Sequence, residues 1–331
     1  MLTSELDYPL PEGLIAQKPV APRDSSRLMV VDVAKGTIEH RVFRDLPWFL
    51  HLGDAVVLNE TKVLPARLVV RRPGGGETEL LFLRDHGGLW EVLVRPSRRL
   101  RAGMTLSVEG AELRIVEPLE GGRWVVVGTN VPEMLKTHGR VPLPPYIEAT
   151  PQAEGAYQTV YARTLGSVAA PTAGLHFTAE VLEEVQQVGA RVSHIILHVG
   201  TGTFAPVRFE KLEDHRMHAE YYYVPDEAAR VVGEAERVVA VGTTVARTLE
   251  SWEATGIREG ESELFIRPGY RWRVVDVLLT NFHLPRSTLL AMVMAFAGED
   301  LIREAYEIAV KERYRFFSFG DAMLLVGGKA W

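Results

Sequence analysis

The chain has 331 residues, of which 47% are hydrophobic and 24% charged, as in ordinary globular proteins, and its formal net charge is −6. It contains no cysteine, which excludes disulfides, a thiolate nucleophile, cysteine-bound zinc and a cysteine-held iron–sulfur cluster. No apolar run reaches the ~18 residues of a membrane span, and the length allows two domains, each with its own core.

The amino-terminal segment predicts the start of a sheet. Residues 1–13 are acidic and interrupted by prolines, so we expect no signal peptide and a cytoplasmic location. Strands are predicted over 28–33, 37–43 and 55–60, with a short helix around 45–52. These strands are too few for a domain, and we expect them to join a sheet formed by the later chain.

From 62 to 150 the pattern changes to short runs of β-formers separated by glycine. Strands are predicted over 66–72, 78–84, 89–96, 104–110, 111–118 and 123–129. Such spacing is typical of a small barrel or sandwich. Prolines at 142, 144 and 145 end the pattern. We therefore expect an inserted β-barrel domain over 62–150 and an α/β domain built from 1–61 and 151–331.

Basic residues concentrate in the predicted barrel. Arg95, Arg98, Arg99 and Arg101 form the densest cluster in the chain. One interpretation is an ordinary solvated face. The other is a patch that contacts phosphates, for which arginine offers a bidentate grip.

After residue 151 strands and helices alternate. Strands are predicted over 190–199, 237–241, 271–280 and 322–327, and helices over 178–189, 226–236, 244–254, 287–298 and 300–314. Alternation of this kind favours an α/β fold in which helices flank a parallel or mixed sheet. The predicted fold is thus a mixed sheet with flanking helices plus an inserted small β-barrel.

Three of these strands end in small or polar residues, at the edge where open α/β sheets bind ligands. Thr243 or Thr244, and Ser287, are expected to cap the helices that follow the second and third strand. The free N–H groups of those helices suit a carboxylate or a sugar hydroxyl.

Residues 166–178 form an apolar, tight run with no helix or strand period, ending in His176 and Thr178. Thr178 is placed to cap the helix over 178–189. The run is either a buried crossing of two segments or part of a ligand site.

Histidines allow a metal interpretation, which we weigh as an alternative. His194 and His198 share one strand face, and His215, His218 and Glu220 have the spacing H-x-x-H-x-E. This set fits a metal-dependent hydrolase, but no tight ligand pattern such as H-E-x-x-H occurs, and we expect no metal. A non-catalytic RNA-binding protein, with the barrel as reader, is the other alternative.

Several unusual runs together carry a family resemblance. They lie at 6–20, 23–32, 53–68, 166–178, 197–207, 215–224, 240–251, 278–290 and 315–323. Over nearly its whole length the chain resembles the S-adenosylmethionine:tRNA ribosyltransferase-isomerases of queuosine biosynthesis. The resemblance implies an α/β domain that carries an inserted β-barrel. It also implies transfer and rearrangement of the ribosyl part of S-adenosylmethionine onto the aminomethyl group of 7-aminomethyl-7-deazaguanine in tRNA.

This reaction implies partners and site residues. The co-substrates are S-adenosylmethionine and tRNA with the modified base at the wobble position, without a metal, and we expect a monomer. A base must deprotonate the carbon beside the sulfonium and an acid must protonate adenine; the candidates are His176, His198, His218, His283 and Asp321. The expected cofactor-binding residues are Thr172, Gly174, Phe177, Gly200, Thr201, Gly202, Gly242, Thr243, Thr244 and Asn281. The expected RNA-binding residues are Arg23, Lys62, Arg67, Arg95, Arg98, Arg99 and Arg101.

Overall fold

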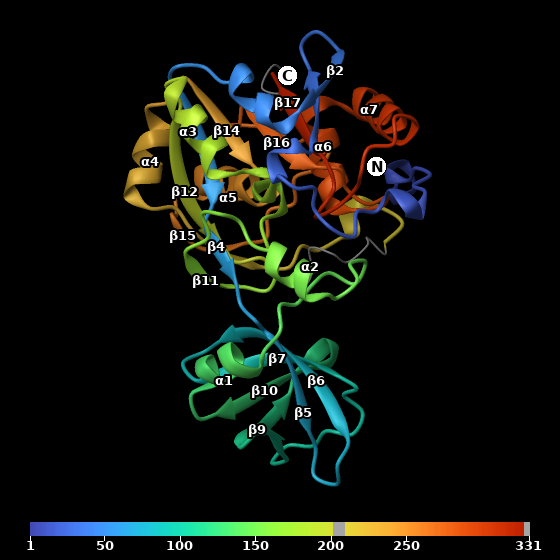
Figure 1. The fold of residues 1–331 in the computed structure, drawn as a ribbon, viewed down its shortest axis with the longest axis vertical. Coiled ribbons are helices and arrows are strands. Elements are labelled where there is room, and N and C mark those ends of the chain that lie inside the picture. Colours follow the sequence, from blue (N-terminus) through green and yellow to red (C-terminus); the bar gives the residue numbers. More distant parts are fainter. Residues whose placement is uncertain (201–208, 328–331) are drawn as a thin grey trace.

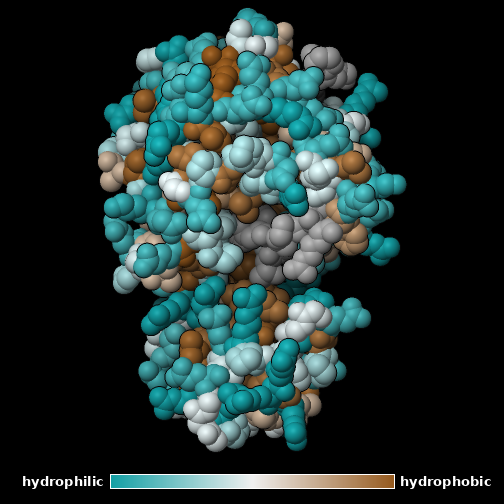
Figure 2. All heavy atoms as spheres, turned by 90° about the vertical axis from the view of Figure 1, so that its right-hand side faces the viewer, coloured by the Kyte–Doolittle hydropathy of each residue, from teal (hydrophilic) through white to brown (hydrophobic). Residues whose placement is uncertain are grey.

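The computed structural model describes residues 1–200 and 209–327, and Thr201 and Gly202 therefore lie outside the described residues. The chain forms a larger α/β part and a smaller β-barrel joined by two crossing segments (Figure 1). The surface narrows between the two parts, and the barrel is covered largely by polar side chains (Figure 2). The predicted fold class is confirmed.

The larger part is built on a mixed nine-stranded sheet. Its strands are, in sheet order, β15 (Glu259–Ser262), β13 (Glu220–Tyr223), β12 (Arg191–Leu197), β3 (Asp54–Asn59), β14 (Arg237–Val241), β16 (Val277–Asn281), β17 (Ala322–Val326), β1 (Arg27–Asp32) and β2 (Thr37–Val42). Strands β12, β3, β14 and β16 are parallel, whereas β17 pairs antiparallel with β16 and parallel with β1.

Helices cover both faces of this sheet. One face packs against α4 (Asp226–Gly233), α5 (Thr243–Thr255), α6 (Thr288–Ala297) and α7 (Glu299–Lys311). The other packs against α3 (Ala179–Gln187) and the 3-10 helix η4 (Phe43–Phe49). Strand β3 is covered on both faces, which explains its uninterrupted apolar sequence. Ala55 and Val57 pack in the core on the α5 side, and Val56 and Leu58 pack in the core on the α3 side.

The inserted part is a closed six-stranded antiparallel barrel. Its strands are β5 (Arg67–Arg71), β6 (Glu77–Asp85), β7 (Leu89–Arg95), β8 (Thr105–Val108), β9 (Ala111–Pro118) and β10 (Arg123–Gly128). Alternate residues fill its core, to which α1 (Val131–His138) contributes Val131, Met134 and Leu135. Closure removes the exposed edges that a sandwich of these short strands would leave.

Two segments connect the parts. The chain enters the barrel through β4 (Thr61–Val63) and returns to the α/β part between α1 and α2 (Pro151–Ala156) (Figure 1). Strand β11 (Thr164–Ser167), which follows α2, then pairs parallel with β4. Arg67 and Arg140 exchange backbone hydrogen bonds of 3.0 and 2.8 Å where the chain enters and leaves the barrel. Arg84 of β6 also forms an ion pair of 2.5 Å with Glu261 of β15. The exact domain limits at 62 and 150 stay a prediction.

The structure corrects one predicted strand. Strand β16 begins at Val277, whereas the sequence pattern predicts a strand from 271. The carboxylate of Glu250, fully buried on α5, accepts the N–H groups of Arg273, Val274 and Val275 at 2.9–3.0 Å. A carboxylate that binds successive N–H groups leaves none of them for a neighbouring strand. Glu250 therefore sets where the strand starts.

Candidate functional site

The carboxyl edge of the sheet brings most predicted site residues together. Strands β12, β3, β14 and β16 end at this edge, and because β17 runs antiparallel to β16, Asn281 pairs with Ala322 there. The amino ends of β17 and β1 consequently join the same edge. Loops that follow or precede these strands place His198, Gly242, His283 and Asp321 along it. These residues thus lie at the edge where open α/β sheets bind ligands, and their role in a site stays a prediction.

His176 is the hub of a buried network that ties the 166–178 run to the sheet. Its Nε2 accepts a hydrogen bond of 3.0 Å from Asn281 Nδ2, and its Nδ1 lies 2.8 Å from Ser26 Oγ. With Asn281 as donor, the ring proton resides on Nδ1 and is donated to Ser26. Burial, with Arg315 and Arg23 nearby, lowers the pKa of His176 to about 3. The ring stacks on Phe43 at 5.0 Å and is neutral near pH 7.

The other expected cofactor residues of this run also have structural partners. Thr172 Oγ1 donates to Asn281 Oδ1 at 3.0 Å. A Cβ at Gly174 would stand 1.8 Å from the hydroxyl oxygen of Tyr161, so only glycine fits there. Phe177 is fully buried in the core beside Phe43. The run is therefore a tightly packed support for the sheet edge.

His198 lies just beyond β12 and faces the junction with the barrel. Its Nδ1 is 2.8 Å from Thr61 Oγ1, and its ring stacks on Tyr221 at 5.5 Å. A Cβ at Gly166 would stand 2.4 Å from Nε2, so Gly166 leaves that nitrogen its space. Burial and then Arg84 lower the pKa of His198 to about 4. The imidazole is half-buried and, with this pKa, neutral near pH 7.

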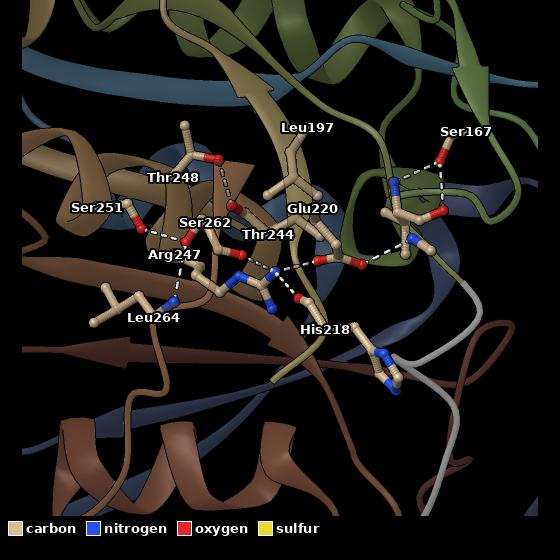
Figure 3. A network of polar contacts seen from close by, with 12 residues as sticks. Ser167, Leu197, His218, Glu220, Thr244, Arg247, Thr248, Ser251, Ser262 and Leu264 are labelled. Atoms are coloured by element: carbon tan, nitrogen blue, oxygen red, sulfur yellow. Dashed lines mark hydrogen bonds and ion pairs between the residues drawn. The ribbon is translucent and has the colours of Figure 1, made fainter. Parts of the chain in front are cut away.

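A buried ion pair lies on the other side of β12. Glu220 and Arg247 are 5% and 6% exposed, and their Oε2 and Nη2 atoms are 2.5 Å apart (Figure 3). Glu220 Oε1 accepts the N–H of Gly200 at 2.8 Å. Arg247 Nη2 also donates to the carbonyl oxygen of Ser262 at 3.2 Å. The pair thus holds together α5, β13, β15 and the chain after β12.

The predicted caps of α5 and α6 are partly wrong. Ser287 caps α6 as expected, because its hydroxyl accepts the N–H of Leu290 at 3.1 Å. For α5 the N-cap is Gly242, with φ of 96°, and Thr243 is the first helical residue. A glycine is required because this positive φ strains other residues. Among the residues that the structure describes, no side chain caps the first N–H groups of α5.

Three further catalytic candidates have different surroundings. His218 is exposed, and its imidazole is directed away from the Glu220–Arg247 pair (Figure 3). His283 is buried, with Nε2 2.8 Å from Thr280 Oγ1, and burial lowers its pKa to about 3. Asp321 is buried and accepts the backbone N–H groups of Arg27 and Arg315 at 3.1 and 2.8 Å. Of these three, only His218 is open to solvent.

The histidine and glutamate set considered for a metal is not gathered. Within residues 1–200 and 209–327, no three histidine, aspartate or glutamate side chains are placed to hold a metal ion. His215 packs against Phe265 with ring centroids 5.5 Å apart, and Glu220 pairs with Arg247. The same ranges contain no helix long and apolar enough to cross a membrane.

The predicted RNA-binding residues fall into three places. Arg23 donates to the carbonyl oxygens of Gln158 and Ala156 at 2.7 and 2.9 Å, and burial lowers its pKa. Lys62 is exposed on β4, and Arg67 at the start of β5 lies 3.9 Å from Glu79. The guanidinium of Arg23 therefore binds backbone carbonyl groups within the α/β part, whereas Lys62 faces solvent between the two parts.

The cluster of Arg95, Arg98, Arg99 and Arg101 is exposed and makes no ion pair within the described part of the chain. It follows β7, which runs antiparallel to β6. Because the carboxyl end of β6 reaches Glu261 through Arg84, the cluster lies toward the opposite end of the barrel. The barrel presents this basic surface away from the sheet edge.

Sequence reasoning misses the partners that hold the site. Ser26 and Thr61 bind His176 and His198, and Asn59 joins β3 to the end of β12 through Leu197 at 3.0 and 3.1 Å. The sequence does not single out Arg247, because it lies on a helix 27 residues after Glu220. An arginine that directly follows Val245 and Ala246 in the first turns of the helix is the available signal.

Comparison with known proteins agrees with the sequence resemblance. A family model described as "Queuosine biosynthesis protein" matches residues 3–325. A protein of Rubrobacter xylanophilus named S-adenosylmethionine:tRNA ribosyltransferase-isomerase is 70% identical over 329 residues, covering 99% of this chain and 98% of its own length. A protein of Moorella thermoacetica with the same name is 51% identical, covering 98% and 100%.

A solved structure shares the fold. The crystal structure of S-adenosylmethionine tRNA ribosyltransferase from Thermotoga maritima aligns with a TM-score of 0.57 at 39% sequence identity. The alignment covers 98% of this chain and 100% of that one.

Proposed function

We infer that this chain, which belongs to the queuosine biosynthesis protein family, is an S-adenosylmethionine:tRNA ribosyltransferase-isomerase. The observation that carries this conclusion is 70% identity over almost the full length of a relative with that name. The enzyme transfers the ribosyl part of S-adenosylmethionine onto the aminomethyl group of 7-aminomethyl-7-deazaguanine in tRNA. The ribosyl group is rearranged to an epoxycyclopentanediol, and adenine and methionine are released.

For the proton transfers, we propose His198 as the base and His218 as the acid. The base must take a proton from the carbon beside the sulfonium, so it must be neutral and reach the substrate. His198 meets both needs, because its pKa is about 4 and its ring is half-buried at the sheet edge. The acid must also reach the substrate, and His218 is the candidate whose imidazole is exposed to solvent.

The other candidates are proposed to support the site. His176, His283 and Asp321 are buried and held by neighbouring side-chain or backbone groups. Asn281 and Thr172 fix the 166–178 run. Among the cofactor candidates, Gly200, Gly242, Thr243 and Thr244 stay our proposed contacts to S-adenosylmethionine, because they follow β12 and β14 at the edge where ligands of α/β sheets bind.

Adenine release should not depend on an added metal. Purified protein, treated with a chelator and then given S-adenosylmethionine and tRNA carrying the aminomethyl base, is expected to release adenine at an unchanged rate. The reason is that the proposed proton transfers use side chains only. Chromatographic measurement of adenine checks this. A requirement for a divalent ion, or transfer of a methyl group in place of the ribosyl group, would contradict the proposed reaction.

The exposed arginine cluster should contribute to tRNA binding. Replacing Arg95, Arg98, Arg99 and Arg101 together by alanine is expected to weaken tRNA binding and to lower the slope of log K against log salt by about one for each phosphate that these arginines neutralise. Affinity for S-adenosylmethionine should stay within about twofold, because the cluster lies at the far end of the barrel. Filter binding at several salt concentrations measures the slope. An unchanged slope would show that tRNA does not bind this surface.

We further propose that the enzyme is a monomer, that it acts in the cytoplasm where tRNA is found, and that the modified base occupies the wobble position. The tRNA named for the relatives supports the choice of partner. A tRNA in which the wobble nucleotide alone is unmodified guanine should accept no ribosyl group.

A further inference from the structure

A pocket lies between the first turns of α5 and α6 and the start of β13. We call it the α5–α6 pocket, and it is open to solvent on one side. Its walls are mostly aliphatic or thioether side chains, namely Met217, Leu264, Ile266, Leu289 and Met292. Its polar lining comes from the first turns of α5 and α6 and from the Glu220–Arg247 pair. The chemistry of the pocket is thus apolar with one polar end.

The polar end favours an anion. Two helices of 13 and 10 residues begin at this pocket, and within the described chain no side chain caps the first N–H groups of α5. Helix N-termini carry partial positive charge and bind carboxylates and phosphates. The formal charges of Glu220 and Arg247 cancel, so the partial positive charge of the uncapped α5 N-terminus is not offset by a net charge of this pair.

Arg247 supplies an independent sign of a missing ligand. The side chain is 6% exposed and lines the pocket, and its Nε–H has no hydrogen-bond partner within the described residues. Native structures rarely keep a buried donor unpaired without a reason, because the hydrogen bond that it loses to water is not replaced. A ligand oxygen at this position would satisfy the donor. Glu220 holds the guanidinium in place through Nη2, which leaves Nε to a bound group.

Shape and polarity distinguish the class of ligand. A nucleic-acid phosphate requires wide access and polar walls, whereas this pocket is lined by aliphatic side chains behind its polar end. A short apolar chain that ends in a carboxylate matches both features. Such a group is present in the substrate of the proposed reaction, as the amino-acid end of S-adenosylmethionine.

We propose that the α5–α6 pocket binds the methionyl arm of S-adenosylmethionine, with its carboxylate at the N-terminus of α5 and at Arg247. This assignment rests on the proposed function and adds the part of the substrate that these residues recognise. The two methylene groups between the α-carbon and the sulfonium pack against Leu289 and Met292, and the carboxylate of Glu220 attracts the ammonium group. The ribose then points toward the sheet edge, where His198 and Thr244 lie. Arg247 is a specificity-determining residue for the carboxylate.

The test compares S-adenosylmethionine with its decarboxylated analogue. Affinities are measured by calorimetry on the full chain, with and without tRNA that carries guanine in place of the modified base. The parent protein should bind the analogue at least tenfold more weakly. In Arg247→Lys, which keeps the charge but lacks the Nε donor, this ratio should fall below about threefold. A merely structural role of Arg247 would weaken both ligands equally and leave the ratio unchanged.

A pocket-filling variant keeps the proposal testable if Arg247→Lys does not fold. Leu289→Trp should lower the affinity for S-adenosylmethionine at least tenfold and leave that for tRNA within twofold. Val188→Trp, at the opposite edge of the sheet, is the matched control and should change neither. Equal affinity of the parent for both ligands, or loss of tRNA binding in Leu289→Trp with S-adenosylmethionine binding kept, would overturn the assignment. Failure of the proposed function is distinguishable, because the parent would then release no adenine from S-adenosylmethionine with substrate tRNA.

Discussion

Replacement of His198 by alanine should reduce turnover by about 10²-fold or more, with the affinity for S-adenosylmethionine kept within about threefold. His198 is the proposed base, and a positioned base contributes about 10²–10⁴-fold to rate. Adenine release at saturating S-adenosylmethionine and tRNA measures turnover. His218→Ala should lose turnover to a similar extent, since its ring is the proposed acid.

The buried candidates provide matched controls for this experiment. His176→Ala and His283→Ala remove side chains that are held inside the sheet edge, and Asp321→Ala removes a carboxylate that accepts two backbone N–H groups. Loss of such a buried acceptor costs about 1–3 kcal/mol for each group left unpaired. These three variants should therefore unfold at lower urea concentrations than the parent. The molecules that remain folded should keep most of the turnover.

The pH profile gives a second measure of the same proposal. A base with a pKa of about 4 stays neutral down to acidic pH. On the acid side of the turnover profile, activity should therefore fall with a midpoint nearer pH 4 than about pH 6.5, the pKa of a free histidine. If all five alanine variants turn over within about threefold of the parent, the acid and base lie elsewhere, and Asp24 and Glu220 are the next residues to replace.

Much of the fold follows from hydrophobic pattern. The barrel strands and the central strands of the sheet are long β-forming runs bounded by glycine or polar residues, and their packing on both faces keeps the pattern visible. The edge strand β15 and its neighbour β13 do not follow from it. They are four residues long, and β15 reads Glu259-Gly260-Glu261-Ser262, which has no strand propensity of its own. Pairing with β13 at the sheet edge, and not local preference, makes it a strand.

The sheet edge that holds the candidate site is predictable from the sequence, but the contacts among its residues are not. Strands that end in small residues mark the carboxyl edge from sequence alone, and His198 and Asn281 follow from that rule. The contact of His176 with Ser26 joins residues 150 apart, and no local pattern encodes it. The predicted cap of α5 is wrong because threonine is the usual choice there, whereas the backbone at Gly242 needs a positive φ that only glycine adopts easily. Tertiary contacts thus decide the details.

The folded chain should lose stability steeply as pH falls from 7 to 5. Burial lowers the pKa of His176 and of His283 to about 3, whereas a histidine in the unfolded chain titrates near 6.5. Between about pH 3 and 6.5 the unfolded state therefore binds more protons, and the free energy of unfolding rises with pH in that window. Each histidine should remove about 2 kcal/mol of stability between pH 7 and pH 5.

Urea denaturation at pH 7, 6 and 5 measures this dependence. The variants His176→Gln and His283→Gln each remove one titrating group, so each should reduce the change in unfolding free energy between pH 7 and 5 by about 2 kcal/mol, whatever its stability at pH 7. Comparing the slopes of unfolding free energy against pH separates the effect of histidine titration from the stability that the substitution itself removes. His51→Gln, at an exposed position before β3, should keep the parental slope. A parental stability that is the same at pH 7 and pH 5 would mean that these histidines are protonated in the folded chain, which their burial and hydrogen bonds oppose.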